Sequence, residues 1–111
     1  MIRFRAWRRS KYGSVRTECD GILFDSQREA DRYKELRLFL KAGAIKDLQL
    51  QPKFEIIHNG VNICFYRADF SYFDCSLETV VVEDVKGYRT REYKLKVKMM
   101  RAFYGIEIKE I

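Results

Sequence analysis

A run of β-branched residues that ends in charges, the segment Val80–Gly87 (VVVEDVKG), predicts a β-strand with polar groups at its end. Because side chains alternate along a strand, Asp84 and Lys86 leave on one face and Glu83 on the other. Burying a carboxylate or an ammonium is costly unless it is paired or bound to something. Taken by itself, the Asp-x-Lys pattern favours a salt-bridged strand end, so its meaning depends on the rest of the chain.

The 111 residues of the chain are enough for one domain. A hydrophobic content of 47%, with eight Phe, seven Tyr and one Pro, predicts ordered α/β structure with a genuine core. The net charge of +6 favours an anionic partner, of which nucleic acid is the commonest. Cys19, Cys64 and Cys75 are odd in number and lack CxxC spacing, which argues against a disulfide framework or a zinc site. No apolar run reaches the ~18 residues of a membrane span, so we expect a soluble cytoplasmic protein without a membrane partner.

Residues 1–17 are interpreted as a basic N-terminal arm and residues 18–111 as a single domain. The arm has no acid before Glu18, and Trp7 and Tyr12 lie among its cations. This composition suits an arm that lies along phosphates, and it suits an ordinary solvated tail equally well. The candidate DNA contacts in the arm are Arg3, Arg5, Arg8, Arg9 and Lys11.

The first helix is predicted from a capping box at Ser26–Glu29, and it extends to about Ala42. The turn signal Asp20–Gly21 precedes it, with Ile22–Phe24 as a short strand or an apolar staple. Helical spacing puts five residues on the face that must pack: Ser26, Glu29, Tyr33, Leu36 and Leu40. Glu29 lies at the edge of this stripe, and its simplest role is reciprocal capping with Ser26.

The middle of the chain predicts an antiparallel meander. Residues 45–57 alternate as one long strand, or as two with a bend at Pro52, which lacks an N–H and belongs at an edge or bulge. Asn59–Gly60 is a type I′ hairpin signal, after which residues 61–73 alternate as the second strand. A turn over residues 74–78 leads to the third strand, residues 79–86.

A second helix is predicted over residues 91–104, with Thr90 as its cap and Gly105 as its stop. Its apolar stripe consists of Leu95, Met99, Ala102 and Phe103, joined at the edge by Tyr93, Val97 and Met100. Residues 106–111 alternate as a final strand, and a strand–helix–strand unit requires a right-handed parallel crossover. The predicted fold is therefore α/β (α+β), in the order αβββαβ, with a mixed four-stranded sheet flanked by helices.

Pairing of the second and third strands brings Asp69 and Asp84 together, because each lies about five or six residues from the intervening turn. Two carboxylates at that distance repel unless a cation or a proton lies between them. The one histidine, His58, lies next to a turn and is interpreted as a surface residue, and the cysteines lack zinc-site spacing. An all-oxygen site therefore favours Mg²⁺ or Mn²⁺. Lys86 would lie beside the metal and steady the charge that develops in phosphodiester hydrolysis. The basic second helix would hold the polyanion through the candidate contacts Arg89, Arg91 and Lys94.

Four phrases in the right order carry a resemblance to a known family. They are DGILFDSQREA from Asp20, LQPKF from Leu50, ADF from Ala68 and VEDVKG from Val82. These phrases resemble a family of small, largely uncharacterised phage and prophage proteins within the PD-(D/E)xK nuclease superfamily. The resemblance covers about Lys11 to the C-terminus, and the core of that superfamily, the restriction-endonuclease-like core, is similar to the order of elements predicted above.

The resemblance implies roles for several residues. Asp69 would be the first metal ligand and Asp84 the second, with the Val85 carbonyl as a further ligand and Lys86 as the catalytic lysine. Glu29 matches a helical acid that binds a metal directly or through water in many members.

The resemblance also matches Gln51 to a polar strand residue that touches a phosphate or a water. Ala68 stands where the superfamily has a proline, and Asp84 stands where glutamate is commoner. Glu83 is excluded because it points to the opposite face, unless a bulge shifts the register.

Together these features predict a metal-dependent endodeoxyribonuclease that uses Mg²⁺ or Mn²⁺ and is encoded by a phage, acting in the cytoplasm of a bacterial host. Analogy alone suggests branched or replicating DNA as the substrate and a homodimer as the assembly. The alternative is a DNA-binding or interaction module that keeps the fold without catalysis. In that case the acids form salt bridges with Lys86 or Arg67, and Glu29 serves as a cap.

Overall fold

The computed structural model describes residues 16–85 and 89–111, which form two helices and eight strands. In order, they are β1 (Thr17–Cys19), β2 (Ile22–Phe24), α1 (Gln27–Lys41), β3 (Ile45–Leu50), β4 (Lys53–His58), β5 (Val61–Arg67), β6 (Phe70–Asp74), β7 (Thr79–Asp84), α2 (Arg91–Tyr104) and β8 (Ile108–Glu110). The predicted catalytic residue Lys86 lies outside the described residues. So do the five predicted DNA contacts of the basic arm, Arg3, Arg5, Arg8, Arg9 and Lys11.

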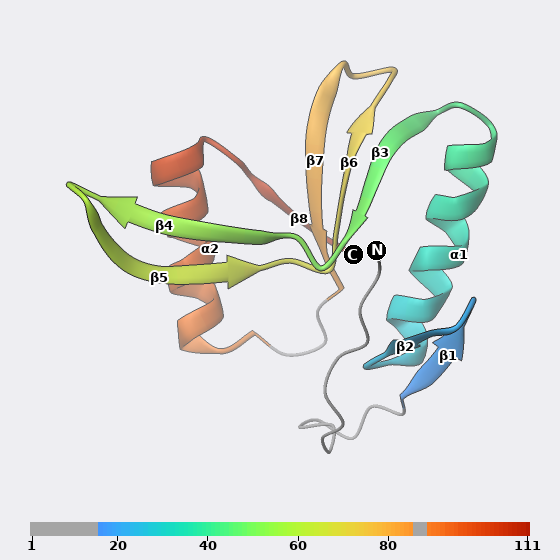
Figure 1. Cartoon of the computed structure of the whole chain (residues 1–111), viewed down its shortest axis with the longest axis horizontal. Helices are drawn as coiled ribbons and strands as arrows, with labels where there is room; N and C mark the ends of the chain where they lie inside the picture. The colour runs from blue at the N-terminus through green and yellow to red at the C-terminus, as the bar shows by residue number, and fades with distance from the viewer. Residues whose placement is uncertain (1–15, 86–88) are drawn as a thin grey trace.

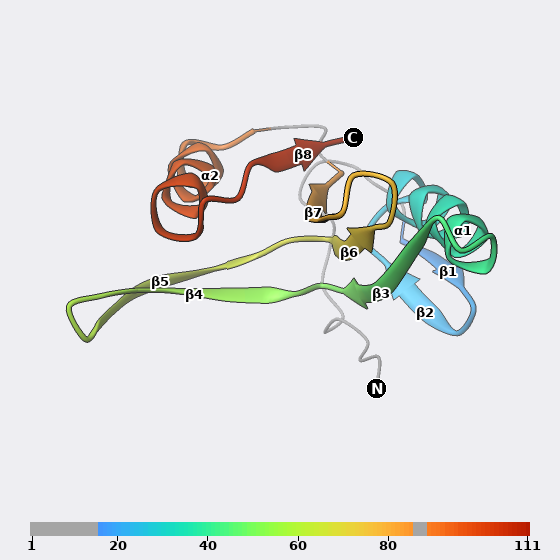
Figure 2. The same ribbon diagram turned by 90° about the horizontal axis from the view of Figure 1, so that it is seen from above.

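A mixed four-stranded sheet with the order β3-β6-β7-β8 forms the centre of the molecule (Figure 1). β6 pairs antiparallel with β3 and β7, whereas β8 runs parallel to β7, and α2 makes the connection that a parallel pair requires. Figures 1 and 2 place α1 and α2 on opposite sides of this sheet. The prediction of a mixed four-stranded sheet flanked by helices is confirmed, with two extra hairpins, β1–β2 and β4–β5.

Local polar signals set the ends of both helices. Ser26 Oγ accepts the N–H of Glu29 at 3.1 Å, and Thr90 Oγ1 accepts the N–H of Tyr93 at 3.0 Å. These side chains satisfy backbone donors that the first helical turn leaves without partners. α2 ends at Gly105 in the left-handed conformation, with φ 67°. The predicted bounds of α2 are therefore confirmed.

Two hydrophobic clusters cover the two faces of the central sheet. The cluster beneath α1 consists of Ile22, Phe24, Ala30, Tyr33, Leu36, Ile45, Phe70 and Tyr72. The cluster beneath α2 consists of Ile56, Tyr66, Ala68, Val82, Tyr93, Met100 and Ile108. The central sheet therefore separates two hydrophobic cores, one beneath each helix.

The buried stripe of α2 differs from the predicted one. Tyr93 and Met100 are buried, whereas Leu95 and Phe103 of the predicted stripe are exposed. α2 packs against β8 and against the β4–β5 hairpin together. These two surfaces rotate the buried stripe of the helix away from the position that apolar periodicity alone favours.

The predicted strand over residues 61–73 is also interrupted. β5 and β6 are separated by Ala68 and Asp69, and the alternation of side chains changes face there. Tyr66 lies in the cluster beneath α2, whereas Phe70 lies in the cluster beneath α1. An even spacing of four residues would have placed both rings on the same face of an unbroken strand.

The neighbouring chain segment bends at the same level, between β3 and β4. Gln51 has φ 52°, and its N–H donates to the Asp69 carbonyl at 2.9 Å. The N–H of Ala68 donates to the Pro52 carbonyl at 3.1 Å. We call these four residues, Gln51, Pro52, Ala68 and Asp69, the corner. Beyond it the β4–β5 hairpin, which we call the ribbon, extends away from the sheet and lies over α2 (Figure 2).

The packing of the ribbon on α2 gives a stability prediction with a matched control. Ile56 is fully buried in the cluster beneath α2, whereas its neighbour Ile57 is exposed. Ile56→Ala is expected to lower the free energy of unfolding by about 2–5 kcal/mol, since it leaves a cavity. Ile57→Ala is expected to change it by less than about 0.5 kcal/mol. Urea denaturation followed by circular dichroism measures both, and equal effects would contradict this packing.

Candidate functional site at the corner

Asp69 and Asp84 lie at the same level of the sheet. The antiparallel register pairs Phe70 with Glu83, and the two aspartates are the next residues outward, Asp69 before Phe70 and Asp84 after Glu83. The N–H of Asp69 donates to the Glu83 carbonyl at 3.1 Å. Asp69 Oδ2 accepts the N–H of Val85 at 2.8 Å. The carboxylate of Asp69 therefore reaches the residue that follows Asp84, which is the proximity that counting from the turn predicts.

Asp84 is almost fully buried, with 1% of its surface exposed, at the end of β7. Its Oδ2 accepts a hydrogen bond from the hydroxyl of Tyr66, which reaches it from the ribbon. The ring of Tyr66 lies 6.5 Å from the ring of Tyr93 on α2. Asp84 is thus held from the side of the sheet that α2 covers.

Glu110 is a further acid at this position, and the sequence reasoning missed it. β8 pairs it directly with Asp84, so their side chains share a face. Tyr93 donates to Glu110 Oε2 at 2.8 Å, and Arg89 donates from Nε to Glu110 Oε1 at 2.8 Å. Burial, together with the hydrogen bond to Glu110 and the nearby charge of Asp84, raises the pKa of Tyr93 above its ordinary value. Its phenol therefore stays protonated and acts as a donor.

Glu83 points to the other face of β7, as its parity predicts. It is fully buried and receives two hydrogen bonds from Arg32 of α1, Nε to Oε1 at 2.9 Å and Nη2 to Oε2 at 2.6 Å. The hydroxyl of Tyr72 also donates to Glu83. The hydrogen bond to Glu83 raises the pKa of Arg32, and burial followed by the same acceptor raises that of Tyr72. Arg32 therefore balances the charge of Glu83 on the side of the sheet that α1 covers.

The remaining predicted site residues lie on three other parts of the fold: α1, the corner and α2. Glu29 is buried in the first turn of α1, where Ser26 caps its N–H. Gln51 belongs to the corner and is bonded through its backbone to Asp69. Arg91 and Lys94 are exposed in the first turn of α2.

The described part of the chain shows no metal-ligand cluster, no disulfide and no membrane-spanning helix. Within residues 16–85 and 89–111, no three His, Cys, Asp or Glu side chains gather as a potential metal site, so Glu29 does not join the two aspartates in such a group. Cys19, Cys64 and Cys75 form no disulfide. No helix among the described residues has the length and apolar character needed to cross a membrane.

The pair formed by Arg32 and Glu83 gives a prediction with a natural control on the surface. Arg32→Ala is expected to lower the free energy of unfolding by about 3–5 kcal/mol, because it leaves the buried Glu83 without its counter-ion. Arg101 makes a similar two-bond contact with Glu107, but both side chains are exposed. Arg101→Ala should therefore cost no more than about 1 kcal/mol. Chemical denaturation of both variants at pH 7 checks this, and similar losses would contradict the burial of the first pair.

Comparison with known proteins identifies a family for the chain. A family model described as "Protein of unknown function (DUF1064)" matches residues 9–110. No significant match was found among the curated proteins or among the solved structures. The matched range includes the corner, Asp69 directly before β6, Asp84 at the end of β7, and both helices. The chain therefore belongs to the DUF1064 family.

Proposed function

We propose that this protein is a metal-dependent endodeoxyribonuclease with a PD-(D/E)xK-type core, which hydrolyses DNA phosphodiester bonds at the corner. The observation that supports the proposal is the position of Asp69 and Asp84, at one level of neighbouring strands. In the superfamily that the sequence resembles, acids at these positions hold a divalent cation.

The donor atoms at this position suit a hard cation. Asp69 and Asp84 offer carboxylate oxygens, and the Val85 carbonyl would add another oxygen at the end of β7. Mg²⁺ and Mn²⁺ prefer carboxylate, carbonyl and water oxygens to nitrogen or sulfur. When bound, such an ion would polarise the scissile phosphate and lower the pKa of the attacking water.

The protein's own groups would orient these ligands. The backbone N–H of Val85 holds the carboxylate of Asp69, and the hydroxyl of Tyr66 holds that of Asp84. The resemblance assigns Lys86, two residues after Asp84, the role of the catalytic lysine. In that role its ammonium would stabilise the negative charge of the pentavalent phosphorus transition state. Glu29, on α1, would act on the ion through water.

Cations near the site would hold the DNA backbone. Arg89 is bonded to Glu110, which β8 pairs with Asp84, and Arg91 and Lys94 follow in the exposed first turn of α2. Gln51 belongs to the corner and would contact a phosphate or a water. The net charge of +6 agrees with a polyanionic substrate. Phage origin, a branched or replicating DNA substrate and a homodimer belong to this proposal through the resemblance.

A second candidate is a DNA-binding module that keeps the fold without catalysis. The observation in its favour is that each carboxylate accepts a hydrogen bond within the chain: from the Val85 N–H for Asp69, from the Tyr66 hydroxyl for Asp84 and from the Ser26 hydroxyl, at 3.5 Å, for Glu29. On this alternative the acids serve the stability of the corner and the capping of α1. The two candidates differ in their response to divalent cations.

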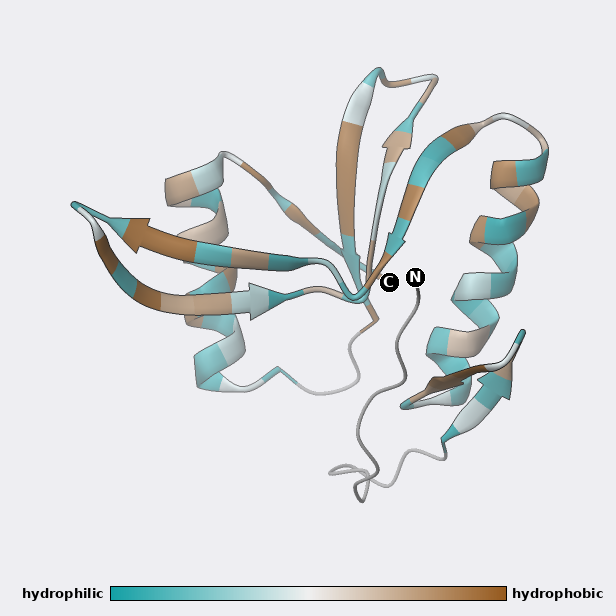
Figure 3. Cartoon of the chain, in the orientation of Figure 1, coloured by the Kyte–Doolittle hydropathy of each residue, from teal (hydrophilic) through white to brown (hydrophobic). Residues whose placement is uncertain are grey.

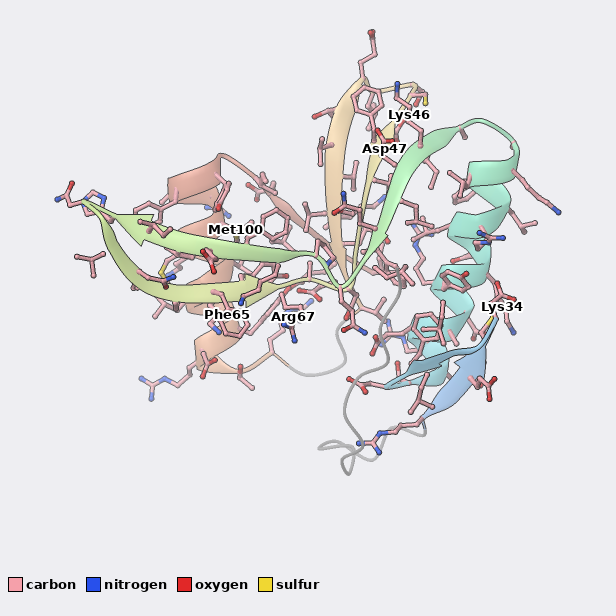
Figure 4. The ribbon with its side chains drawn as sticks, in the orientation of Figure 1. Lys34, Lys46, Asp47, Phe65, Arg67 and Met100 are labelled. Atoms are coloured by element: carbon pink, nitrogen blue, oxygen red, sulfur yellow. The ribbon has the colours of Figure 1, made fainter. Side chains whose placement is uncertain are left out.

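Asp84→Asn and Lys86→Ala are each expected to reduce Mg²⁺-dependent DNA cleavage by at least about 100-fold, since the first weakens a ligand of the ion and the second removes the cation that stabilises transition-state charge. Linear, nicked, flapped and four-way DNA, each with and without Mg²⁺, are the substrates. Binding measured by fluorescence anisotropy in EDTA should stay nearly unchanged. Asp47→Asn is the control, because Asp47 is exposed and lies toward the end of the sheet away from the corner (Figure 4). Undiminished cleavage by either purified variant would reject the assignment.

Mg²⁺ or Mn²⁺ should also raise the melting temperature of the protein. A ligand that binds only the native state stabilises it by about 2.7 kcal/mol at 100 times its dissociation constant. The shift should disappear in Asp69→Asn and persist in Asp47→Asn. Differential scanning fluorimetry across a metal titration measures it, and the absence of any shift in the native sequence would favour the non-catalytic module.

A further inference from the structure

α2 covers one face of the ribbon and leaves most of the other face exposed. Its inner face carries Phe54, Ile56, Cys64 and Tyr66, which pack in the cluster beneath α2. The strand register pairs Lys53 with Arg67 and Glu55 with Phe65, and strand alternation puts these four residues on the opposite face. All four are exposed. We call this surface the outer face of the ribbon.

Three cations surround one exposed aromatic ring on this surface. Phe65 is 42% exposed, and the Nζ atom of Lys53 lies 4.6 Å from its ring centroid. Lys96 reaches the same ring from α2, with its Nζ atom 5.4 Å from the centroid. The guanidinium carbon of Arg67 lies 5.6 Å away, and Figure 4 shows Phe65 and Arg67 along β5. Each other ring with such a contact in the described part of the chain has one cation, as at Phe39 and Phe73. Two acids lie beside these cations, Glu55 at 4.0 Å from Lys53 and Glu92 at 3.1 Å from Lys96, so the cations outnumber the acids by one.

Apolar surface continues from Phe65 toward the tip of the ribbon. Ile57 and Ile63 are each 51% exposed, and Figure 3 shows hydrophobic residues along the outer half of both strands. A purely apolar partner would remove water from three cations without supplying anions, which is costly. A second copy of the chain that presented the same face would bring like charges together. An occupant with both flat apolar rings and negative charges fits this surface better.

We propose that the outer face of the ribbon binds unpaired nucleotides, with a base stacked on Phe65 and its phosphates near Lys53, Arg67 and Lys96. Unpaired bases expose the faces that a duplex hides, and stacking on an aromatic side chain tolerates any base. The inference rests on the proposed function and names its substrate: DNA in which paired and unpaired segments meet. Lys53 and Arg67 are the ribbon pair next to the corner, so a strand held there leads toward Asp69.

The test compares two phenylalanines of equal exposure. Phe65→Leu is expected to weaken binding of a labelled single-stranded oligonucleotide by about tenfold, with little effect on a fully paired duplex of the same sequence. Phe39→Leu is the control, because Phe39 is also 42% exposed and has one cation, Arg32, at 5.9 Å from its ring. Fluorescence anisotropy in EDTA measures binding without cleavage, and melting curves show that both variants are folded.

A second pair of variants tests the cations. Log affinity falls as log salt concentration rises. Lys53→Ala should make this negative slope less steep by about 0.7, the value for one phosphate contact on a single strand. Lys46→Ala should leave the slope unchanged, because Lys46 lies over the ring of Phe73 at 5.0 Å, on β3 and away from the ribbon.

The proposal is overturned if Phe65→Leu binds the single strand as tightly as the native sequence, or if Phe39→Leu loses as much. It is also overturned if Phe65→Leu converts a dimer to a monomer in sedimentation velocity while DNA binding is unchanged, since the surface then joins two copies. Loss of single-strand binding by Phe65→Leu in a protein that never cleaves would support this inference and reject the nuclease. Metal-dependent cleavage together with unchanged single-strand binding by Phe65→Leu would support the nuclease and reject this inference.

Discussion

Two backbone hydrogen bonds at the corner, from Gln51 to Asp69 and from Ala68 to Pro52, hold two neighbouring chain segments in a bend at the same level. A bend in one strand alone would leave ladder groups of its partner unsatisfied, at about 1–3 kcal/mol for each buried group. Because both segments bend together, pairing resumes on either side, as sheet before the corner and as ribbon after it. Pro52 fits there since it has no N–H to satisfy. The same bend leaves Asp69 beside β7 and turns the ribbon onto α2.

The end of β7 shows how two successive buried acids can be accommodated. A buried carboxylate is tolerated when it is hydrogen-bonded or paired, and strand alternation sends Glu83 and Asp84 to different partners. Glu83 meets Arg32 and Tyr72 on the side of α1, whereas Asp84 meets Tyr66 on the side of α2. Each helix therefore covers one of the two acids, and the sheet between them keeps the like charges on separate faces.

Signals that act over a few residues were readable in the sequence. The caps at Ser26 and Thr90 and the stop at Gly105 fixed the helices, and counting from one turn was enough to bring Asp69 level with Asp84. Properties set by distant partners were not readable. The change of face at Asp69 depends on the bend in the neighbouring segment, and the place of Glu110 beside Asp84 depends on a parallel register that the packing of α2 determines. The buried stripe of α2 was misjudged for the same reason, since two surfaces rather than one decide it.

The corner also has a mechanical consequence. The ribbon projects from the corner as a two-stranded arm (Figure 1). Asp69, whose carbonyl accepts the N–H of Gln51, is one of the residues at which that arm joins the sheet. The carboxylate of Asp69 accepts the N–H of Val85, directly after β7, a strand that does not continue into the ribbon. A force on the ribbon would therefore be transmitted to Asp69 directly, because this residue belongs to both the junction and the pair of acids. The packing of Ile56 against the cluster beneath α2 opposes such a displacement.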